Sequence, residues 1–458
     1  MKSYGAALKN RVKSILEDKD SGRLLFNVAG NYVVKACSML VSLLVMPAYM
    51  TYFSSQTLLG MWFTAVSIIE WVLLFDFGIG AGMRNQIIAP LNEGNKQRTK
   101  EIISAAYFSV GIIAAILIVV QHFIVEWVDW YSVFGIQTND IDANTLYTVL
   151  HILLIGVCIR FFSALILHLL YALQKASLVS LVNLLSSVFI LVYLKLATPT
   201  GNNADIIKLA LVQALATNVP AFVTMIVVFA GRLKGMLPSL SYFHVEQAKS
   251  VLGTSGWLFY LQTLLMFVFG VKEIFISWFV GAEQVVDYQI YQKLIGIVGS
   301  LFALALSPIW SAVTKAYIEK KTAWIKNLYK QGTKMIALFS LGQLVLVLMM
   351  PLLSKVWLGS NAIEIHLSYG LIFCLYNSIY MWVMMNYQFA CGLECPKTIS
   401  ACLTFSLAAN LILSFAFSRV YPSWISVVTA TSIALIPCAV LAPKDIWKAI
   451  SHKNRNLL

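Results

Sequence analysis

The sequence predicts an all-α protein that crosses a membrane about twelve times, and three observations lead to that prediction. Hydrophobic residues make up 59% of the 458 residues, and only 12% of the residues are charged. The mean hydropathy is +0.79. Apolar stretches long enough to cross a bilayer recur along the whole chain, with short connections between them. A transmembrane helix needs about 20 apolar residues, so these stretches leave little of the chain for a soluble domain.

The predicted spans follow one another at fairly even intervals. Each is a run of apolar residues of membrane-spanning length, bounded by polar or charged residues. The first six are expected at 26–52, 57–80, 102–127, 145–172, 177–197 and 206–230. The second six are expected at 252–280, 286–313, 335–358, 365–390, 398–418 and 424–442.

The basic loops divide these spans into two halves of six. The two most basic internal loops, around 94–100 and 319–326, lie about half a chain apart. This spacing fits a parallel repeat of two bundles around a central cavity, although evenly placed loops can also arise by coincidence. We therefore predict bundles at 26–245 and 246–442. A basic tail at 1–25 and a C-terminal tail at 443–458 complete the chain.

The distribution of charge predicts that both termini are cytoplasmic. Most of the 33 Lys and Arg residues fall in the two tails and in alternate loops, whereas the intervening loops hold mainly acidic residues. Lys and Arg are retained on the cytoplasmic side during membrane insertion. The net charge of +13 is explained by this topology and by anionic headgroups, so we expect no nucleic-acid partner.

The sequence contains no motif that would support an enzyme. The longest loops, at 82–101, 231–251 and 314–334, are roughly 20 residues each, which is too short for an independent core. No Walker, HExxH or GxSxG pattern is present. The seven cysteines lie mostly within predicted spans and resemble packing residues rather than metal ligands. We expect neither catalytic activity nor a bound metal or cofactor.

Polar residues inside the spans carry most of the functional information. Asn31 and Lys35 lie four residues apart in the first span, and Gln289 and Lys293 repeat that spacing in the eighth. This spacing places both members of each pair on one helix face. A charge at the bilayer centre costs about 2.5 to 3.5 kcal/mol unless it faces water or a partner. We therefore predict a cationic cavity lined by Lys35, Arg160 and Lys293, with Asn31 and Gln289 beside the lysines.

Acids inside the spans leave a second interpretation open. Glu70, Asp76, Glu273 and Asp287 match the cations within the spans in number, so every cation can also be neutralised by a structural partner. Lys272 is adjacent to Glu273 and is read as such a pair. Glu70 has no basic neighbour in the sequence, which makes it the best candidate for carrying a coupling proton, with Glu273 as a second acid.

The segment from the second span into the next loop carries the most specific pattern. It reads Gly60-Met-Trp-Phe-Thr and later Asp76-Phe-Gly-Ile-Gly-Ala-Gly-Met-Arg84-Asn85. This pattern resembles the Wzx-type O-antigen and capsule flippases of the polysaccharide transport family, within the MOP (multidrug, oligosaccharidyl-lipid, polysaccharide) exporter superfamily. The resemblance includes 31–47 and, more loosely, the length and span count. It implies a conformationally important element, in which Asp76 and Arg84 are candidate gating residues.

The resemblance also implies a function, a substrate and a location. Such a protein would be a flippase of the bacterial inner membrane that moves a polyprenyl-pyrophosphate-linked oligosaccharide from the cytoplasmic to the outer leaflet by alternating access. Lys or Arg residues would offset the desolvation of the pyrophosphate. H⁺ or Na⁺ is a candidate coupling ion, and polysaccharide polymerase or chain-length proteins are candidate partners.

Three further points from the sequence remain open. Tyr376, Tyr380 and Tyr387 of the tenth span can stack on sugars, although packing or interfacial anchoring explains them equally well. A cation-coupled multidrug exporter of the same superfamily is one alternative function, and it is disfavoured because the first span carries Lys35 and no acid. A non-transporting scaffold for polysaccharide assembly enzymes is the other.

Overall fold

The computed structural model describes residues 19–74, 79–201, 203–248, 256–306, 309–393, 395 and 397–455. All regular structure in these residues is helical, as the sequence predicts. The chain divides into two compact parts, and each is described by itself. The first part comprises Met1–Ala48, Phe75–Trp127 and Asn144–Gly256. The second part comprises Tyr49–Leu74, Val128–Ala143 and Trp257–Leu458.

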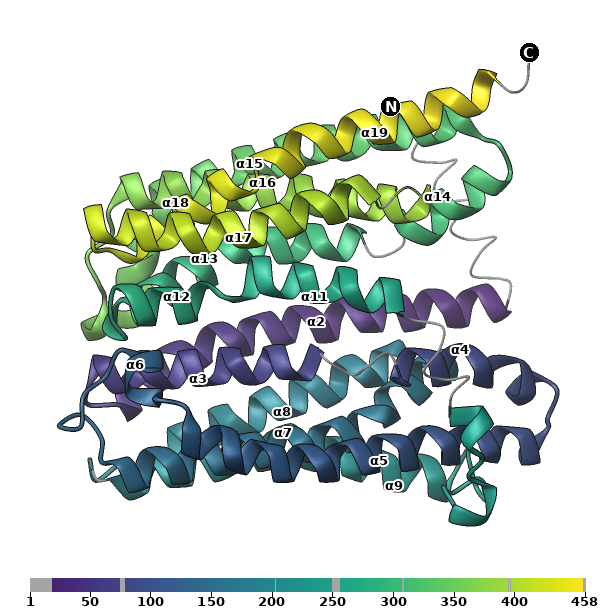
Figure 1. The fold of residues 1–458 in the computed structure, drawn as a ribbon, viewed down its shortest axis with the longest axis horizontal. Coiled ribbons are helices and arrows are strands. Elements are labelled where there is room, and N and C mark those ends of the chain that lie inside the picture. The colour runs from purple at the N-terminus through teal and green to yellow at the C-terminus, as the bar shows by residue number, and fades with distance from the viewer. Residues whose placement is uncertain are drawn as a thin grey trace. The chain divides into compact units, whose positions relative to one another are not determined.

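Long helices make up the first part, and they run lengthwise beside one another (Figure 1). They are α2 (Lys19–Tyr52, with its last turn in the second part), α4 (Ile79–Asn92), α5 (Lys96–Trp127), α7 (Ala143–Ala172), α8 (Ala176–Leu196) and α9 (Asn203–Ala230). A short 3₁₀ helix, η1 (Leu240–Tyr242), follows them. Helices α7 and α9 approach closely at Gly156, where an added Cβ would lie 2.8 Å from the Cβ of Ala214.

The second part is also built from helices alone in the residues described. Its first elements are α3 (Gln56–Leu74), α6 (Trp130–Phe134), α11 (Gly256–Gly270), α12 (Lys272–Phe279), α13 (Glu283–Leu306) and α14 (Ile309–Ile318). The remaining elements are α15 (Thr322–Leu358), η2 (Gly359–Asn361), α16 (Leu367–Gly392), α17 (Lys397–Val420), α18 (Trp424–Ala434) and α19 (Ile436–Arg455). Helix α16 packs against α13, α14, α15, α18 and α19 and therefore forms the centre of this part.

The described residues confirm a polytopic helical fold. Nine of their helices are long and apolar enough to cross a membrane, and the number is ten when α11 and α12, bent by 43° at their junction, count as one span. Helix α3 follows the predicted second span as far as residue 74, and 75–78 lie outside the description. Helices α13 and α14 together cover the predicted eighth span, apart from residues 307 and 308.

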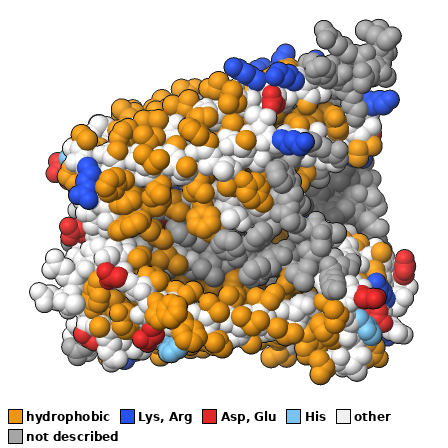
Figure 2. Space-filling model, viewed as in Figure 1, with side chains coloured by type: hydrophobic (Ala, Val, Ile, Leu, Met, Phe, Trp, Pro, Cys, Tyr) orange, Lys and Arg blue, Asp and Glu red, His pale blue; other side chains and the backbone are white. Residues whose placement is uncertain are grey.

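Hydrophobic side chains cover the outer surface of the helices, as a lipid environment requires. Figure 2 shows them over the middle of the helices in each part, with charged side chains toward the helix ends. On α15, for example, Leu348 is 71% exposed and Leu352 is 62% exposed. A water-soluble protein would bury such residues, so this surface supports membrane insertion of both parts.

Glycines set two close approaches in the second part. An added Cβ at Gly60 of α3 would lie 1.7 Å from the carbonyl oxygen of Ala282, just before α13. Gly135 ends α6 with a left-handed φ of 59°, and a Cβ there would lie 2.2 Å from the oxygen of Ser277. The Ser277 hydroxyl in turn donates to the carbonyl of Phe134 over 2.6 Å. These contacts hold α3 against the start of α13, and α6 against α12.

Candidate functional site

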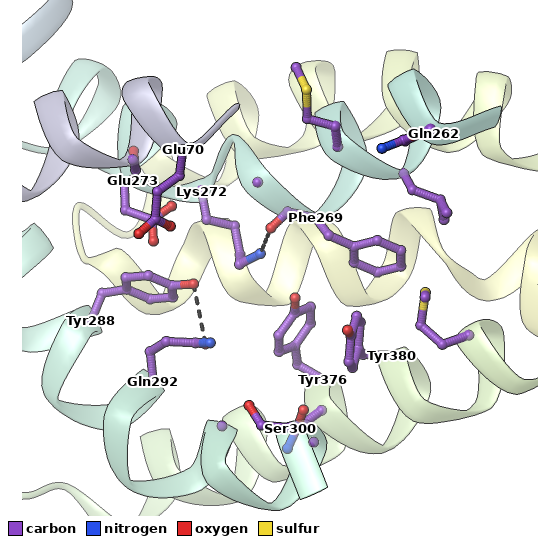
Figure 3. A pocket seen from close by; sticks show the side chains of 18 residues that line it. Glu70, Gln262, Phe269, Lys272, Glu273, Tyr288, Gln292, Ser300, Tyr376 and Tyr380 are labelled. Atoms are coloured by element: carbon purple, nitrogen blue, oxygen red, sulfur yellow. Dashed lines mark hydrogen bonds between the residues drawn. The ribbon is translucent and has the colours of Figure 1, made fainter. Parts of the chain in front are cut away.

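A cavity of about 560 Å³ lies within the second part and is lined by residues of α3, α11, α12, α13 and α16 (Figure 3). Its size falls within the range of roughly 300–1,000 Å³ that is usual for small-molecule sites. Aromatic, amide, hydroxyl and charged side chains share its wall. The cavity therefore offers both apolar surface and hydrogen-bonding groups to one ligand.

The break between α11 and α12 places two charges at the cavity. Helix α11 ends at Gly270 and α12 begins at Lys272, so the last carbonyls of α11 lose their partners within the helix. The Lys272 ammonium group donates to the carbonyl of Phe269 and so satisfies one of them. It also lies 5.0 Å from the ring centroid of Tyr376, a distance at which a cation is attracted to the ring face.

Two carboxylates accompany Lys272. Glu273 is only 9% exposed, and its Oε1 accepts a hydrogen bond of 3.2 Å from Nε2 of Gln289. Glu70 of α3 lines the cavity and is accessible from it. The charges of Glu70 and Glu273 both act on Lys293, which lies on α13 one turn beyond Gln289. Glu70, Lys272, Glu273 and Lys293 thus form a charge cluster whose formal charges cancel.

An aromatic wall lies beside this charge cluster. Phe269 meets Tyr380 edge to face, with ring centroids 5.0 Å apart. Tyr376 and Tyr380 are four residues apart on α16, so their rings share one face of that helix (Figure 3). On α13, the hydroxyl of Tyr288 donates to Gln292 over 3.4 Å. Rings alternate here with groups that can donate or accept hydrogen bonds.

Asn377 fixes the helices behind the aromatic wall. Its Nδ2 donates to the carbonyl of Ile295 over 3.2 Å and to Oε1 of Gln343 over 3.1 Å. Gly299 allows this contact, because a Cβ there would lie 2.6 Å from Oδ1 of Asn377. Asn377 is 4% exposed and links α16 to α13 and α15, so the wall is held by hydrogen bonds as well as by apolar packing.

The structure places the predicted site residues in both parts. Four of them come together in the second part at the charge cluster: Glu70, Glu273, Gln289 and Lys293. The others belong to the first part. Lys35 is exposed on α2, and the side chain of Asn31 lies outside the description. Asp76 also lies outside the described residues.

Arg160 occupies a polar helix crossing in the first part. It is 7% exposed, and its guanidinium donates to the carbonyl of Thr217 on α9 over 2.8 Å. Next to it, the Ser163 hydroxyl donates to Oδ1 of Asn218 over 2.9 Å, and Nδ2 of Asn218 donates to the carbonyl of Gly156 over 2.9 Å. This α7–α9 junction gives Arg160 a backbone partner between two packed helices.

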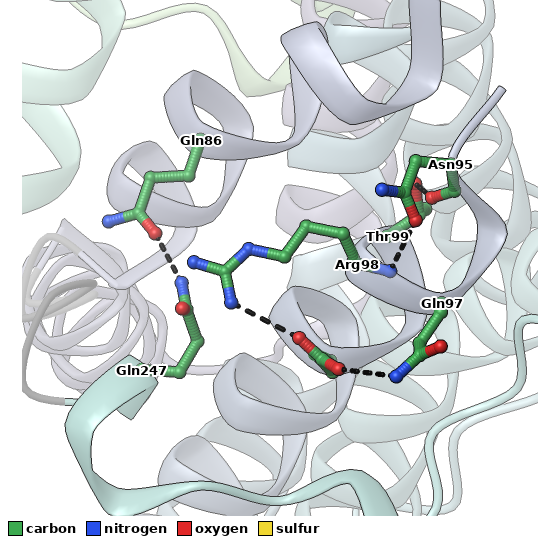
Figure 4. Close-up of polar contacts among 7 residues, drawn as sticks. Gln86, Asn95, Gln97, Arg98, Thr99 and Gln247 are labelled. Carbon is green, nitrogen blue, oxygen red and sulfur yellow. Dashed lines mark hydrogen bonds and ion pairs between the residues drawn. The ribbon is translucent and has the colours of Figure 1, made fainter. Parts of the chain in front are cut away.

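The predicted basic loop forms the turn between α4 and α5 in the first part (Figure 4). Oδ1 of Asn95 accepts from the backbone N–H of Arg98 over 3.0 Å, as an N-cap side chain does. Arg98 also lies 3.1 Å from Glu101. Gln247 donates to Gln86 over 2.6 Å and so ties the segment after η1 to α4.

Arg84, the second gating candidate, lies on α4 and is exposed. Its guanidinium carbon lies 5.8 Å from the ring centroid of Tyr171 on α7. Gly80, one turn earlier, leaves room for His168, because a Cβ at that position would overlap the imidazole ring. The glycine-rich run therefore brings α4 close to α7.

Sequence reasoning missed Lys272, Tyr288 and Gln292 as parts of the cavity wall. From the sequence, Lys272 is interpreted as a structural partner of Glu273, because the two residues are adjacent in the chain. The bend after Gly270 changes the direction of Lys272, and a glycine two positions before adjacent Lys and Glu residues is the signal that the sequence offers. Tyr288 and Gln292 lie on the same α13 face and differ from the chosen Gln289 and Lys293 by one position each.

Comparisons with known proteins agree with the fold. No protein-family model matches the chain. A protein of Yersinia pseudotuberculosis described as a putative O-antigen export protein is 21% identical over 279 residues, or 60% of this chain. The match spans 61% of that protein, which is less than two thirds of its length.

Solved transporter structures cover more of the chain. An inward-facing multidrug resistance MATE family transporter of the MOP superfamily matches 90% of this chain and 95% of its own, with 15% identity and a TM-score of 0.69. An outward-facing MATE family transporter gives a TM-score of 0.64 at 14% identity over 92% of this chain and 96% of its own. A MOP superfamily transporter from Pyrococcus furiosus gives 0.61 at 15% identity, with coverage of 92% and 96%. The chain thus has the fold of these transporters.

Proposed function

We propose that the protein is a flippase that moves a lipid-linked oligosaccharide from the cytoplasmic to the outer leaflet of a bacterial inner membrane. The observation that carries this proposal is the composition of the cavity wall in the second part. A sugar ring presents apolar C–H faces that pack on aromatic rings, and hydroxyl groups that need hydrogen-bond partners. Tyr376, Tyr380 and Phe269 provide the rings, and Gln262 and Gln292 provide amides.

The charges of the cavity support a sugar ligand better than a cationic drug. Lys272 lines the cavity together with Glu70 and Glu273, and the charges of both carboxylates act on Lys293 of α13. A lipophilic cation would gain more from an acidic cavity without lysines, whereas a neutral sugar can accept from lysines and donate to carboxylates. For the negatively charged pyrophosphate we propose Lys293 of the second part, because a cation offsets the desolvation of an anion. Lys35 of the first part is a separate candidate, because it is an exposed cation within a membrane-spanning helix. Arg160 serves packing in this proposal.

The export protein of Yersinia pseudotuberculosis supports the same substrate class, since its description refers to O-antigen export. A cation-coupled multidrug exporter is the second candidate. The inward-facing transporter with the same fold is described as a multidrug resistance protein, and that description favours this candidate. Two carboxylates beside the cavity would suit either H⁺ coupling or Na⁺ coupling in both cases. We assign coupling to Glu70, with Glu273 as its neighbour, and gating to Asp76 and Arg84.

Reconstitution tests the proposal against both alternatives. The purified protein is placed in liposomes that carry a polyprenyl-pyrophosphate-linked oligosaccharide, and flipping is measured as the fraction of sugar reached by an added, membrane-impermeant glycosidase. Faster flipping than in protein-free liposomes is expected. Because no assembly enzyme is present, transport also excludes a pure scaffold. Export of cationic dyes without sugar flipping would instead establish the multidrug exporter.

A further inference from the structure

A cluster of three potential metal ligands lies in the first part and contains none of the residues discussed above. His122 and Glu126 are four residues apart on α5 and therefore share one helix face. His151 comes from α7. One ligand atom from each of the three side chains lies within 4.8 Å of the others, so all three can reach a single ion.

A buried amide orients His151 for metal binding. Nδ1 of His151 lies 3.2 Å from Oε1 of Gln121, whose side chain is 7% exposed. Because an amide oxygen can only accept, this contact suits the tautomer with the proton on Nδ1, which leaves the lone pair of Nε2 available to a ligand. Histidine ligands of metals almost always donate their other N–H to such a group, which fixes the ring and its tautomer. Gln121 is therefore placed as an outer-shell partner of the cluster.

The second imidazole faces the first. The rings of His122 and His151 stack with centroids 5.3 Å apart and an interplanar angle of 26°. Each ring has a nitrogen that can serve as a ligand of the same cation. Glu126 and His122 are exposed, so the open side of the cluster can admit an ion and keep a water ligand.

We propose that His122, Glu126 and His151 bind a divalent cation, with Zn²⁺ as the best match. Two imidazoles and one carboxylate with an open fourth position form a common Zn²⁺ ligand set, whereas Mg²⁺ and Ca²⁺ prefer oxygen ligands. His122 lies five residues before the end of α5 at Trp127, about 7.5 Å along the helix, so the ion is reached from the membrane surface. The charge pattern predicts that this surface is external, and the bound ion would join α5 to α7.

This proposal departs from the expectation of no metal site. That expectation considered the cysteines and motifs with closely spaced ligands. His151 is 29 positions after His122, and only the packing of α7 on α5 brings their rings together. The sequence pattern does not contain the register of two packed helices, so no spacing rule would have identified the third ligand.

Calorimetric titration of the purified full-length protein with ZnCl₂ tests the site, with an affinity tag that contains no histidine. We expect saturable binding of one Zn²⁺ per chain and no comparable binding of MgCl₂. His122→Ala and His151→Ala should each weaken Zn²⁺ binding at least tenfold, and Gln121→Leu should weaken it about tenfold. His244→Ala removes an exposed histidine from the same part of the chain and should change nothing.

Zinc X-ray absorption of the wild-type protein gives a readout that does not depend on the folding of any variant. Two imidazole nitrogens with oxygen ligands are expected. Sulfur ligands would assign the ion to cysteines and overturn the proposal. Zn²⁺ binding that is unchanged in monodisperse His122→Ala and His151→Ala would overturn it as well, and so would the absence of saturable binding to the wild type. None of these results bears on sugar transport.

Discussion

Two buried cations, Arg160 in the first part and Lys272 in the second, show how different roles follow from different partners. Both donate to a backbone carbonyl, and both are less than a tenth exposed. The carbonyl that Arg160 meets belongs to another helix, so the contact joins α7 to α9. The carbonyl that Lys272 meets lies three residues earlier in its own broken helix, and the ammonium remains at a cavity. Burial alone therefore does not identify a substrate-binding cation.

The largest expected effect concerns the packing that positions the cavity. Gly60→Ala should lower the free energy of unfolding by about 3 kcal/mol or more, because the new Cβ would overlap the carbonyl of Ala282. Gly342→Ala is the matched control, since no atom lies within 4 Å of a Cβ added there. It should be neutral or stabilising by about 0.5–1 kcal/mol. Thermal unfolding in detergent measures both, and equal melting temperatures would contradict the close approach.

The next effect separates the two buried cations directly. Arg160→Ala should reduce the amount of folded protein, because a hydrogen bond from a charged donor contributes about 1.5–3 kcal/mol. Transport per folded molecule should stay close to wild type. Lys272→Met should keep its abundance and reduce transport about tenfold, which corresponds to about 1.4 kcal/mol.

Quantitative immunoblots and flipping rates in proteoliposomes measure the two quantities for both variants. The opposite pattern would break the comparison: normal abundance with lost transport for Arg160→Ala, and normal transport for Lys272→Met. Arg160→Lys serves as the conservative variant and should restore part of the abundance, since a lysine can still donate to the carbonyl of Thr217.

A smaller effect sharpens the contrast within the charge cluster itself. Glu70 is open to the cavity, whereas Glu273 is nearly enclosed and accepts from Gln289. A coupling proton needs access to water, so Glu70→Gln should weaken the dependence of flipping on an imposed pH gradient more than Glu273→Gln does. Flipping rates with and without the gradient decide this. Equal gradient dependence in Glu70→Gln and wild type would exclude Glu70 as the coupling residue.

The smallest effect concerns α6 of the second part, where Asp129 caps the helix. Hydrogen bonds from the Ser132 hydroxyl and backbone N–H hold the pKa of Asp129 below its usual value. A lowered pKa in the folded protein adds stability at neutral pH, and this stability is lost as the pH falls below about 4 and through the folded-state pKa. Asp129→Ser keeps a neutral cap, so its melting temperature should differ from wild type at pH 7 and converge toward pH 3. A constant difference would contradict the charge-dependent cap.

The sequence predicts the fold class well and the site only in part, for physical reasons. Hydropathy and helical phase are local properties, so they identify the spans and place Gln289 and Lys293 on one face. The position of Glu70 deep within a predicted span also identifies it as a candidate site residue. The partner of Arg160 lies 57 residues away, at a crossing that depends on tertiary packing. The position of the Lys272 side chain at the cavity depends on the bend after Gly270. Helical phase assumes a straight helix, so it does not predict that position.

Photo-crosslinking from the cavity tests the central claim most directly. A benzophenone amino acid replaces Tyr380, which lines the cavity, or Leu375, which is 59% exposed on the same helix α16. Both variants are illuminated in membranes that contain radiolabelled lipid-linked oligosaccharide. We predict a labelled adduct whose sugar moiety is attached at position 380, with competition by unlabelled substrate, and no competed sugar adduct at position 375. Equal sugar labelling at both positions, or none at position 380, would contradict the assignment of this cavity to the substrate.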